Sequence, residues 1–227
     1  MLPIDTKHEI MAIDLNLNLT DPNWNQYTRF VSKRRQEAIG RFLHIEDKIR
    51  CLYAALLVQK KCTELAGMPL KKQFFQISEG GKPRLTDCNL LFNVSHSGDR
   101  VFACFAYDEI GVDVEELGDA PFYVMKNVFH EAEIAYVESA DDAKSKNERF
   151  YEVWTCKEAF GKCKGDGIIY DLKTLNTRSE PLSDHLTTWF REGYCYSVYM
   201  DDDYHLTLIP ETNESIEHFY KAQCQSQ

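Results

Sequence analysis

The chain carries the segment Trp154-Thr155-Cys156-Lys157-Glu158-Ala159-Phe160-Gly161-Lys162, followed closely by Lys164-Gly165-Asp166-Gly167. At 3.6 residues per turn, Glu158 and Lys162 lie one above the other on one helix face, and Lys157 lies about 100° round from Glu158. The glycines that follow end the helix and let a ligand or another chain segment come close. This face could carry an ordinary surface ion pair, or it could hold a metal ion beside a phosphate.

A second acidic pair favours the metal and phosphate interpretation. The run Ile110-Gly111-Val112-Asp113-Val114-Glu115 is typical of a strand. Because side chains alternate along a strand, Asp113 and Glu115 point to one face while Val112 and Val114 point to the other. Two carboxylates are therefore presented side by side.

Composition restricts the class of protein. The 227 residues are 44% hydrophobic and 27% charged, which describes an ordinary globular chain of one large or two small domains. The net charge of −10 argues against a nucleic-acid partner, because such binding needs a basic face. The longest apolar run, near residues 52–58, is too short to cross a membrane, so we expect no membrane partner.

The ends and the cysteines indicate a cytoplasmic protein. Residues 1–10 have neither a basic leader nor an apolar run with a cleavage site, so we expect no secretory signal. The eight cysteines show no CxxC spacing, so we expect reduced thiols and no zinc site.

Charge is unevenly distributed along the chain. Seven Lys/Arg stand against three acids from Arg29 to Arg50, and thirteen acids stand against four bases from Asp108 to Glu152. A basic segment can hold an anionic ligand while an acidic one supplies metal ligands, although solvated helix faces account for most single charges.

Periodicity predicts an α+β fold in two halves, residues 1–110 and 111–227. In the first half we expect a strand within residues 1–20, helices at 27–42 and 45–65, and strands at 73–77, 90–94 and 101–106. In the second half we expect a strand at 110–115, helices at 121–137 and 147–162, a polar connection at 141–148, and strands at 168–170, 187–191, 194–200 and 204–209. Asp201-Asp202-Asp203 suggests a hairpin between the last two strands, and the tail after Pro210 a frayed helix or disorder.

Three separated motifs occur together in the chain: Asn93-Val94-Ser95-His96-Ser97, Gly111-Val112-Asp113-Val114-Glu115, and Trp154-x-x-Lys157-Glu158-Ala159-x-x-Lys162-x-x-Gly165-x-Gly167. Their order and spacing resemble the Sfp-type 4′-phosphopantetheinyl transferases. The resemblance also includes Gly81-Lys82-Pro83 and the stretch Arg41 to Asp47 before Arg50, and it runs from about residue 30 to 175.

The resemblance implies a fold and a reaction. Such enzymes are pseudo-dimers of two similar α+β halves, each an antiparallel sheet with packed helices, related by a pseudo-twofold axis. They act with Mg²⁺ and move the phosphopantetheine arm of coenzyme A onto a serine of an apo acyl, peptidyl or aryl carrier protein, releasing adenosine 3′,5′-bisphosphate. We also expect a monomer, in the cytoplasm.

The resemblance also assigns residues to the reaction. Asp113, Glu115 and Glu158 would hold Mg²⁺, with Asp113 and Glu158 the firmer ligands. Lys162 would stabilise charge on the transferred phosphoryl group, and Lys157 could assist. Glu158, directly or through a water molecule, would take the serine proton.

Coenzyme A would be held by a further set of residues. Ser95 and His96 would contact a phosphate, and Lys82, Pro83 and Arg50 would hold the adenine and 3′-phosphate end. Arg34 or Arg35 would contact the 3′-phosphate. Glu116 stands where these enzymes often carry a basic residue, which changes the local charge.

Two other functions use the same residues. A Mg²⁺-dependent phosphohydrolase would need no carrier protein, and a non-catalytic carrier-binding subunit should lack one of the acids or the lysine, all of which are present. Phe122, Tyr123, Met125 and Phe129 form a candidate carrier surface, although a buried core stripe explains them equally well.

Overall fold

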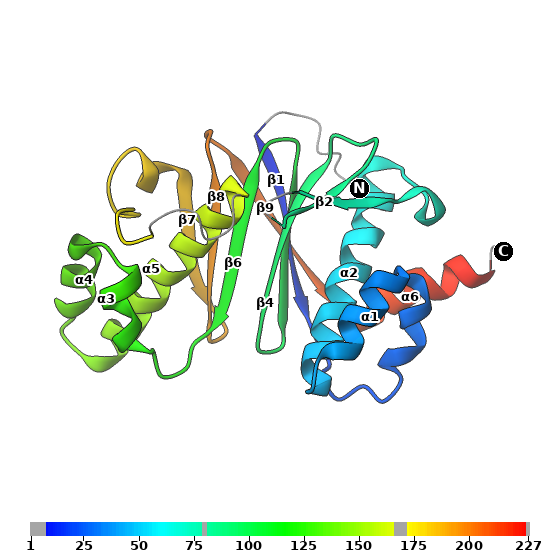
Figure 1. Cartoon of the computed structure of the whole chain (residues 1–227), viewed down its shortest axis with the longest axis horizontal. Helices are drawn as coiled ribbons and strands as arrows, with labels where there is room; N and C mark the ends of the chain where they lie inside the picture. The colour runs from blue at the N-terminus through cyan, green and yellow to red at the C-terminus, as the bar shows by residue number, and fades with distance from the viewer. Residues whose placement is uncertain (1–7, 79–80, 166–171, 226–227) are drawn as a thin grey trace.

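The computed structural model describes residues 8–78, 81–165 and 172–225, with helices on two outer flanks and strands between them (Figure 1). The chain begins with β1 (Glu9–Asn16), the 3-10 helix η1 (Trp24–Phe30), α1 (Lys33–Arg41) and α2 (Ile45–Ala66). It continues through η2 (Leu70–Lys72), β2 (Phe75–Ile77), β3 (Pro83–Leu85), β4 (Leu91–Ser97), β5 (Arg100–Ala106) and β6 (Ile110–Glu116). The helices η3 (Phe122–Val124), α3 (Met125–Val128), α4 (Glu131–Glu138) and α5 (Ala143–Lys164) follow. The last elements are η5 (Leu182–His185), β7 (Leu186–Arg191), β8 (Tyr194–Met200), β9 (His205–Thr212) and α6 (Asn213–Gln225).

Two main sheets form the centre of the molecule. The first has the order β4-β5-β1-β9 and the second the order β6-β8-β7, while β2 and β3 form a separate two-stranded sheet. All pairs are antiparallel except β1 with β9, which is parallel. The expected mixed α+β fold is confirmed.

The alternation of side chains sorts β1 and β5 between two cores. The odd residues of β1, such as Ile13 and Leu15, pack with α2 and α6, while Ile10 and Ala12 face the second sheet. In β5, Ala103 and Phe105 pack toward the helices, while residues 102, 104 and 106 face the second sheet. Both faces of the first sheet are therefore buried, and the layers run helix, sheet, sheet, helix.

The second sheet has one apolar and one polar face. Val112 and Val114 of β6 pack into the core between the sheets, as the sequence predicted. Gly111 and Asp113 instead face α5, and a Cβ on Gly111 would overlap Ala159 O and Cys163 N of that helix. Only glycine therefore allows α5 to lie this close to β6.

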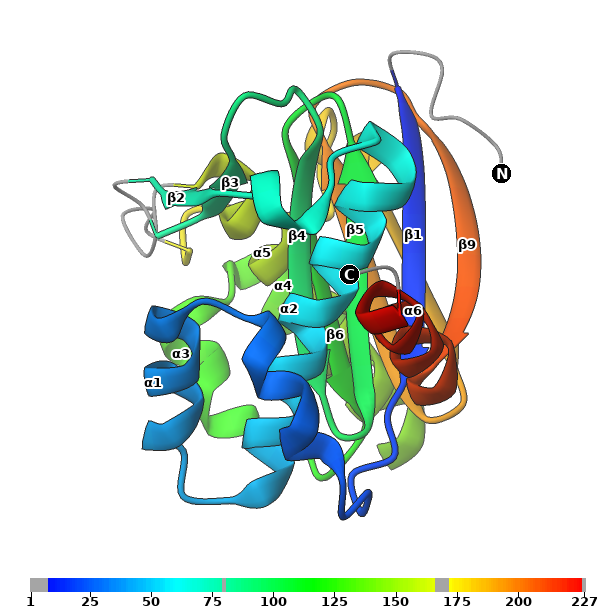
Figure 2. The same ribbon diagram turned by 90° about the vertical axis from the view of Figure 1, so that its right-hand side faces the viewer.

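The end of the chain returns to the first half. The expected division at residue 110 assigns β9 and α6 to the second half, but both pack on the first sheet and on α2, as the turned view also shows (Figure 2). The expected hairpin at residues 201–203 is therefore wrong, because β8 and β9 belong to different sheets. Pro210 is tolerated in β9 because this strand forms the sheet edge.

The tail after Pro210 is an ordered helix. Ile216 and Tyr220 are buried against α2, and the hydroxyls of Tyr27 and Tyr53 donate to Glu217. Ile216 and Tyr220 are four residues apart, so they give α6 one buried face. The polar composition of the tail gives no sign of this face.

Three further predictions differ in detail. The helical region at 27–42 is split into η1 and α1, and Ser32 accepts from Arg35 N as the N-cap of α1. Helix α5 begins at Ala143 because Asp142 caps it, so most of the expected polar connection at 141–148 is helical. The strand expected at 168–170 lies outside the described residues.

The two longest helices correspond in length and ending. Both α2 and α5 have 22 residues, and each ends at a glycine in the left-handed conformation, Gly67 with φ 64° and Gly165 with φ 72°. They lie on opposite flanks of the two sheets (Figure 1). Within the described part of the chain, no helix is long and apolar enough to cross a bilayer.

We predict that Gly111→Ala lowers the free energy of unfolding by about 2–3 kcal/mol, because the new methyl group pushes α5 away from β6. Thermal denaturation measures the loss as a melting temperature about 5 to 10 °C lower. Gly40→Ala in α1 is the matched control. Its Cβ meets no atom within 4 Å, so stability stays equal or rises slightly. Equal stability of Gly111→Ala and the wild type would contradict the close approach.

Candidate functional site

A pocket opens where β4, β6 and α5 meet. Its walls hold the acids and the lysine that the sequence singled out, and it encloses about 330 Å³. The lining side chains are Val94, Ser95, His96, Asp113, Glu115, Trp154, Glu158 and Lys162. The three motifs thus meet around one hollow, although Ser95 and Lys162, which hydrogen-bond each other there, are 67 residues apart in the chain.

Asp113 is the most buried group of the pocket. Its side chain is 3% exposed, and its Oδ1 accepts hydrogen bonds from Lys162 Nζ at 2.6 Å and Ser95 Oγ at 2.7 Å. Lys162 Nζ also donates to Ser95 Oγ at 3.0 Å. The expected i, i+4 arrangement therefore brings Lys162 to Asp113, with Glu158 one helical turn away in the same pocket wall.

Polar side chains of β4 hold β6 in register. Asn93 Oδ1 accepts from Val112 N at 2.9 Å, and Ser97 Oγ donates to Glu115 Oε2 at 2.9 Å. With Ser95 on Asp113, the odd residues of β4 contact β6 in sequence along both strands. The Asn-x-Ser-x-Ser motif therefore aligns the acidic strand against the first sheet.

Burial disfavours the ionised form of all three carboxyl groups of the pocket. Burial, and then the charge of Asp113, raise the pKa values of both Glu115 and Glu158. Burial also raises the pKa of Asp113, although Lys162 opposes the shift. Such a crowd of partly desolvated acids is stabilised by a cation.

The residues fit a bound magnesium ion. Asp113 Oδ2 is buried and has no hydrogen-bond partner among the residues that the structure describes, so one carboxylate oxygen is left for a ligand. Among the residues that the structure describes, no three His, Cys, Asp or Glu side chains form a ready-made metal-binding group. The acids share one pocket wall, however, and Mg²⁺ is usually held by one or two carboxylates, with water and substrate phosphate completing its ligands.

Lys157 does not reach this pocket. Its side chain is 1% exposed, and its Nζ pairs with Glu133 Oε2 at 2.8 Å and donates to the carbonyls of Leu172 and Leu175. Glu133 in turn accepts from both the backbone and the hydroxyl of Thr177. The expected catalytic and coenzyme contacts of Lys157 are therefore not supported by its placement; it ties α5 to α4 and to residues 172–177.

Lys82 and Pro83 also lie away from the pocket lining. Lys82 Nζ is buried and donates to Glu109 Oε2 at 2.9 Å and to Ile110 O at 2.8 Å, at the start of β6. It also approaches Cys163 O at 3.4 Å, in the last turn of α5. Lys82 thus helps hold β6 and α5 together.

The basic residues of the first half that the sequence singled out lie outside the pocket lining. Arg50 donates to Gly98 O at 2.6 Å and pairs with Asp47 at 2.6 Å. Arg35 is half-buried and directs a guanidinium nitrogen toward Cys51 Sγ on α2 at 3.5 Å, whereas Arg34 is exposed. Of the two expected contacts to the 3′-phosphate, Arg35 is the one whose side chain turns toward α2.

His96 lies exposed at the pocket rim. Although much of its side chain meets solvent, desolvation of the ring and the positive charges of Arg50 and Lys162 lower the pKa of His96. The imidazole is therefore neutral at pH 7, and an anion placed among these three groups would favour its charged form.

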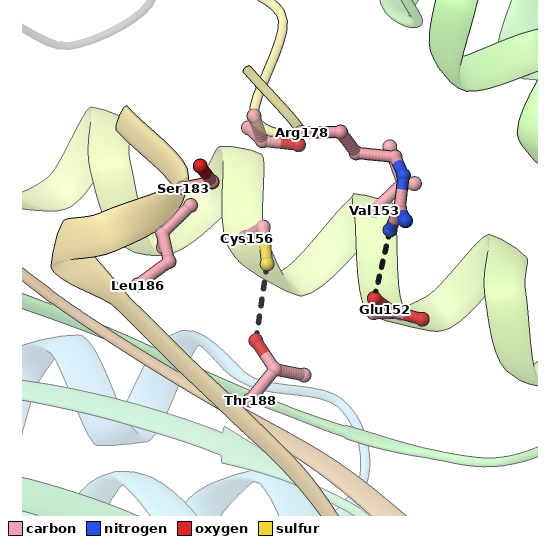
Figure 3. Close-up of a pocket in the computed structure, with 8 residues that line it drawn as sticks. Glu152, Val153, Cys156, Arg178, Ser183, Leu186 and Thr188 are labelled. Atoms are coloured by element: carbon pink, nitrogen blue, oxygen red, sulfur yellow. Dashed lines mark hydrogen bonds and ion pairs between the residues drawn. The ribbon is translucent and has the colours of Figure 1, made fainter. Parts of the chain in front are cut away.

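A second hollow lies on the reverse side of α5. It encloses about 260 Å³, and Figure 3 shows Val153 and Cys156 of α5 facing Leu186 and Thr188, with Arg178 paired to Glu152 at the mouth. Cys156 Sγ lies 3.1 Å from Thr188 Oγ1, and burial raises the pKa of this thiol to about 11. None of the expected site residues lines this hollow.

The stripe proposed as a carrier surface is largely core. Met125 and Phe129 are buried and pack with Phe150, while only Tyr123 is strongly exposed, at 80%. The buried-core interpretation therefore holds for the stripe itself.

All eight cysteines are free thiols.

Comparison with known proteins gives the same result over most of the chain. Residues 109–209 match the 4′-phosphopantetheinyl transferase superfamily, and residues 18–106 match the 4′-phosphopantetheinyl transferase N-terminal family. The transferase ffp of Bacillus subtilis is 30% identical over 194 residues, which cover 82% of this chain and 86% of that protein. The chain belongs to the 4′-phosphopantetheinyl transferase superfamily.

Other relatives of this transferase support the assignment. The 4′-phosphopantetheinyl transferase gsp of Aneurinibacillus migulanus is 31% identical over 64% of this chain and 60% of its own length. The rat L-aminoadipate-semialdehyde dehydrogenase-phosphopantetheinyl transferase is 28% identical over 74% of this chain and 59% of its own length. The expected family and the expected transferase class of enzyme are thereby confirmed.

Sequence reasoning left out several residues that build the transferase site. The sequence assigns Trp154 no role beyond its place in a motif, yet it lines the pocket and its side chain hydrogen-bonds Glu115. Glu133 carries no signal in the sequence that sets it apart from the other acids between Asp108 and Glu152, because its partner Lys157 lies 24 residues onward. The glycine before Asp113 in the motif was the available signal for the contact with α5.

We predict that Lys157→Met lowers the free energy of unfolding by about 3–5 kcal/mol, because it leaves the Glu133 carboxylate buried without its cation. Removing both charges in Glu133→Gln/Lys157→Met restores most of that loss. Denaturant unfolding of the two single variants and the double variant measures the coupling. Strictly additive losses would show that the pair is not linked.

We predict that Glu158→Gln raises the melting temperature at pH 7 in EDTA by a few degrees. A raised pKa means that the folded protein holds this proton more tightly than the unfolded chain does, so stability falls as the pH rises through the carboxyl's ordinary and then its raised pKa. The amide removes that cost, and the gain disappears below the ordinary pKa. Glu148→Gln on the same helix is the control, with no expected gain. A lower melting temperature for Glu158→Gln at pH 7 would contradict the electrostatic analysis.

Proposed function

We propose that this transferase moves the 4′-phosphopantetheine group of coenzyme A onto a serine hydroxyl of an apo acyl, peptidyl or aryl carrier protein. The main support is the pocket in which Asp113, Glu115 and Glu158 meet Lys162 and His96. The serine oxygen forms a bond to the phosphorus that bears the pantetheine, and the phosphoanhydride bond to the nucleotide breaks. Adenosine 3′,5′-bisphosphate leaves.

The magnesium ligands would be Asp113, Glu115 and Glu158. Mg²⁺, when bound there, supplies neutralisation of the diphosphate charge. Asp113 Oδ2, which has no partner within the described ranges, and the raised pKa values of the three acids support this set. Glu115 is anchored by Ser97 and Trp154, so its carboxylate keeps its orientation toward the pocket.

Lys162 and Glu158 would act on the reacting groups. The Lys162 side chain is 30% exposed to the pocket, so its ammonium can contact a phosphate oxygen and stabilise charge as the anhydride breaks. The Glu158 carboxylate, directly or through a water molecule, takes the serine proton. The water route suits a carboxylate that also binds Mg²⁺, because a coordinated cation lowers the basicity of the carboxylate.

Coenzyme A would extend from this pocket toward the first half. Its diphosphate would lie against His96 and Ser95, which line the pocket. Its 3′-phosphate would be held by Arg50, which donates to Gly98 O after β4, and by Arg35, which turns toward α2. Lys82 already has three protein acceptors. We therefore propose that it holds β6 and α5 in position and does not bind a phosphate.

We further propose a cytoplasmic monomer. The eight free thiols suit a reducing compartment. The pocket takes residues from β4 of the first sheet and from β6 and α5 of the second half, so one chain supplies all of its walls.

The decisive experiment incubates the purified chain with coenzyme A, Mg²⁺ and a panel of apo carrier proteins. We expect a mass gain of one phosphopantetheine group on a carrier and none on its serine-to-alanine form, with EDTA abolishing the gain. Glu158→Gln and Asp113→Ala should each lose transfer by at least about a hundredfold while remaining folded, whereas Glu148→Gln retains it.

Two outcomes would overturn the proposal. Cleavage of coenzyme A without any carrier would identify a phosphohydrolase, and carrier binding without modification would identify a non-catalytic subunit. Near-normal transfer by Glu158→Gln or Asp113→Ala would remove that residue from the site.

A further inference from the structure

The turn between α1 and α2 exposes a cluster of apolar side chains. Phe42 is 39% exposed, Leu43 is 91% exposed and Ile45 is 48% exposed. Single exposed apolar residues are ordinary, but three within four residues form a patch. We call residues 42–45 the α1–α2 corner.

The chain, as far as the structure describes it, leaves no buried position for the side chains of the corner. The inward positions of the two helices are already taken by Ile39 and Ile49, which are 3% and 0% exposed in the first core. Phe42 ends α1 and His44 precedes α2, both in extended conformation, so the corner projects beyond the packed helix faces.

The segment around the corner carries a small positive excess on an acidic protein. From Lys33 to Lys48 the sequence has five Lys/Arg against three acids, whereas the whole chain carries a net charge of −10. Arg41 is exposed and Lys48 is half-exposed, and within the described part of the chain neither forms an ion pair. A partner for this surface must therefore be both apolar and acidic.

The corner lies beside the rim of the catalytic pocket. Asp47, in the first turn of α2, is influenced electrostatically by both His44 of the corner and His96 of the pocket wall. Arg50, one turn onward, reaches Gly98 O in the turn after β4. In the two views α1 lies toward the same face as α3 and β2 (Figures 1 and 2).

We propose that the α1–α2 corner is a docking surface for the carrier protein, and that it takes an acidic, amphipathic helix face next to the acceptor serine. This inference rests on the proposed function, because the carrier is the partner that must reach the pocket beside the corner. Leu43 and Phe42 would contact the apolar residues of that helix, and Arg41 and Lys48 its acids. This charge pairing makes docking sensitive to salt.

The test uses the serine-to-alanine form of the carrier that the wild type modifies fastest, so that binding is measured without transfer. We expect Leu43→Ser and Arg41→Glu each to raise the dissociation constant for this carrier about tenfold. Transfer assays should show a higher KM for the carrier, with an unchanged KM for coenzyme A and an unchanged kcat at saturating carrier. The dissociation constant of the wild type should also rise as the salt concentration is raised, and that of Arg41→Glu should rise less steeply.

Matched controls lie at the other end of α2. Phe74 is 66% exposed and Lys71 is exposed, both beyond the last turn of a helix about 33 Å long. Phe74→Ser and Lys71→Glu change the same kinds of side chain on the same half, so the carrier's dissociation constant should stay within about twofold of the wild type.

The outcomes separate this inference from the proposed function. If the wild type transfers but Leu43→Ser and Arg41→Glu bind the carrier as the wild type does, the corner is not the docking surface and the function stands. If the chain self-associates in sedimentation, and Leu43→Ser abolishes that without changing carrier binding, the occupant is a second copy and the inference is wrong. If the wild type neither binds nor modifies any carrier, the function fails and the docking surface falls with it.

Discussion

The close contact between α5 and β6 is the constraint on which the rest of the structure depends. A β-strand carries two acids on one face, and a helix carries a third acid and a lysine on one face. They can share a small ligand only if the two backbones nearly touch. Gly111 permits that approach, because any side chain there would overlap the backbone of α5 near Ala159 and Cys163. Lys82 closes the same contact at its end, where it donates to Ile110 O and approaches Cys163 O.

The layered fold explains why both sheets are needed to form the pocket. The second sheet buries Val112 and Val114 against the first sheet, so its polar face with Asp113 is left for α5. At the front edge, β4 of the first sheet lies along β6, and Asn93, Ser95 and Ser97 hydrogen-bond to it. The return of β9 and α6 then ties the end of the chain to the first sheet.

Local patterns in the sequence predicted the elements and the polar face of β6, since these depend only on periodicity and the motifs. What the sequence could not show was set by distant partners. Lys157 is next to Glu158 in the motif that is predicted to be catalytic, but its position round the helix directs it to Glu133. The β8 and β9 strands flank three acids typical of a turn, yet the edge of the first sheet offered β9 a parallel partner in β1. The polar tail is helical because Ile216 and Tyr220 pack against α2.

The central claim is that the acids of β6 and the acid of α5 serve one divalent cation across this contact. Crystals of the chain grown with coenzyme A and Mn²⁺, a substitute for Mg²⁺ with strong anomalous scattering, test it directly. We predict one anomalous peak in the pocket, within bonding distance of Asp113 and of Glu158 and beside the diphosphate. A peak bound elsewhere, or coenzyme A held outside the pocket that Lys162 lines, would contradict the account.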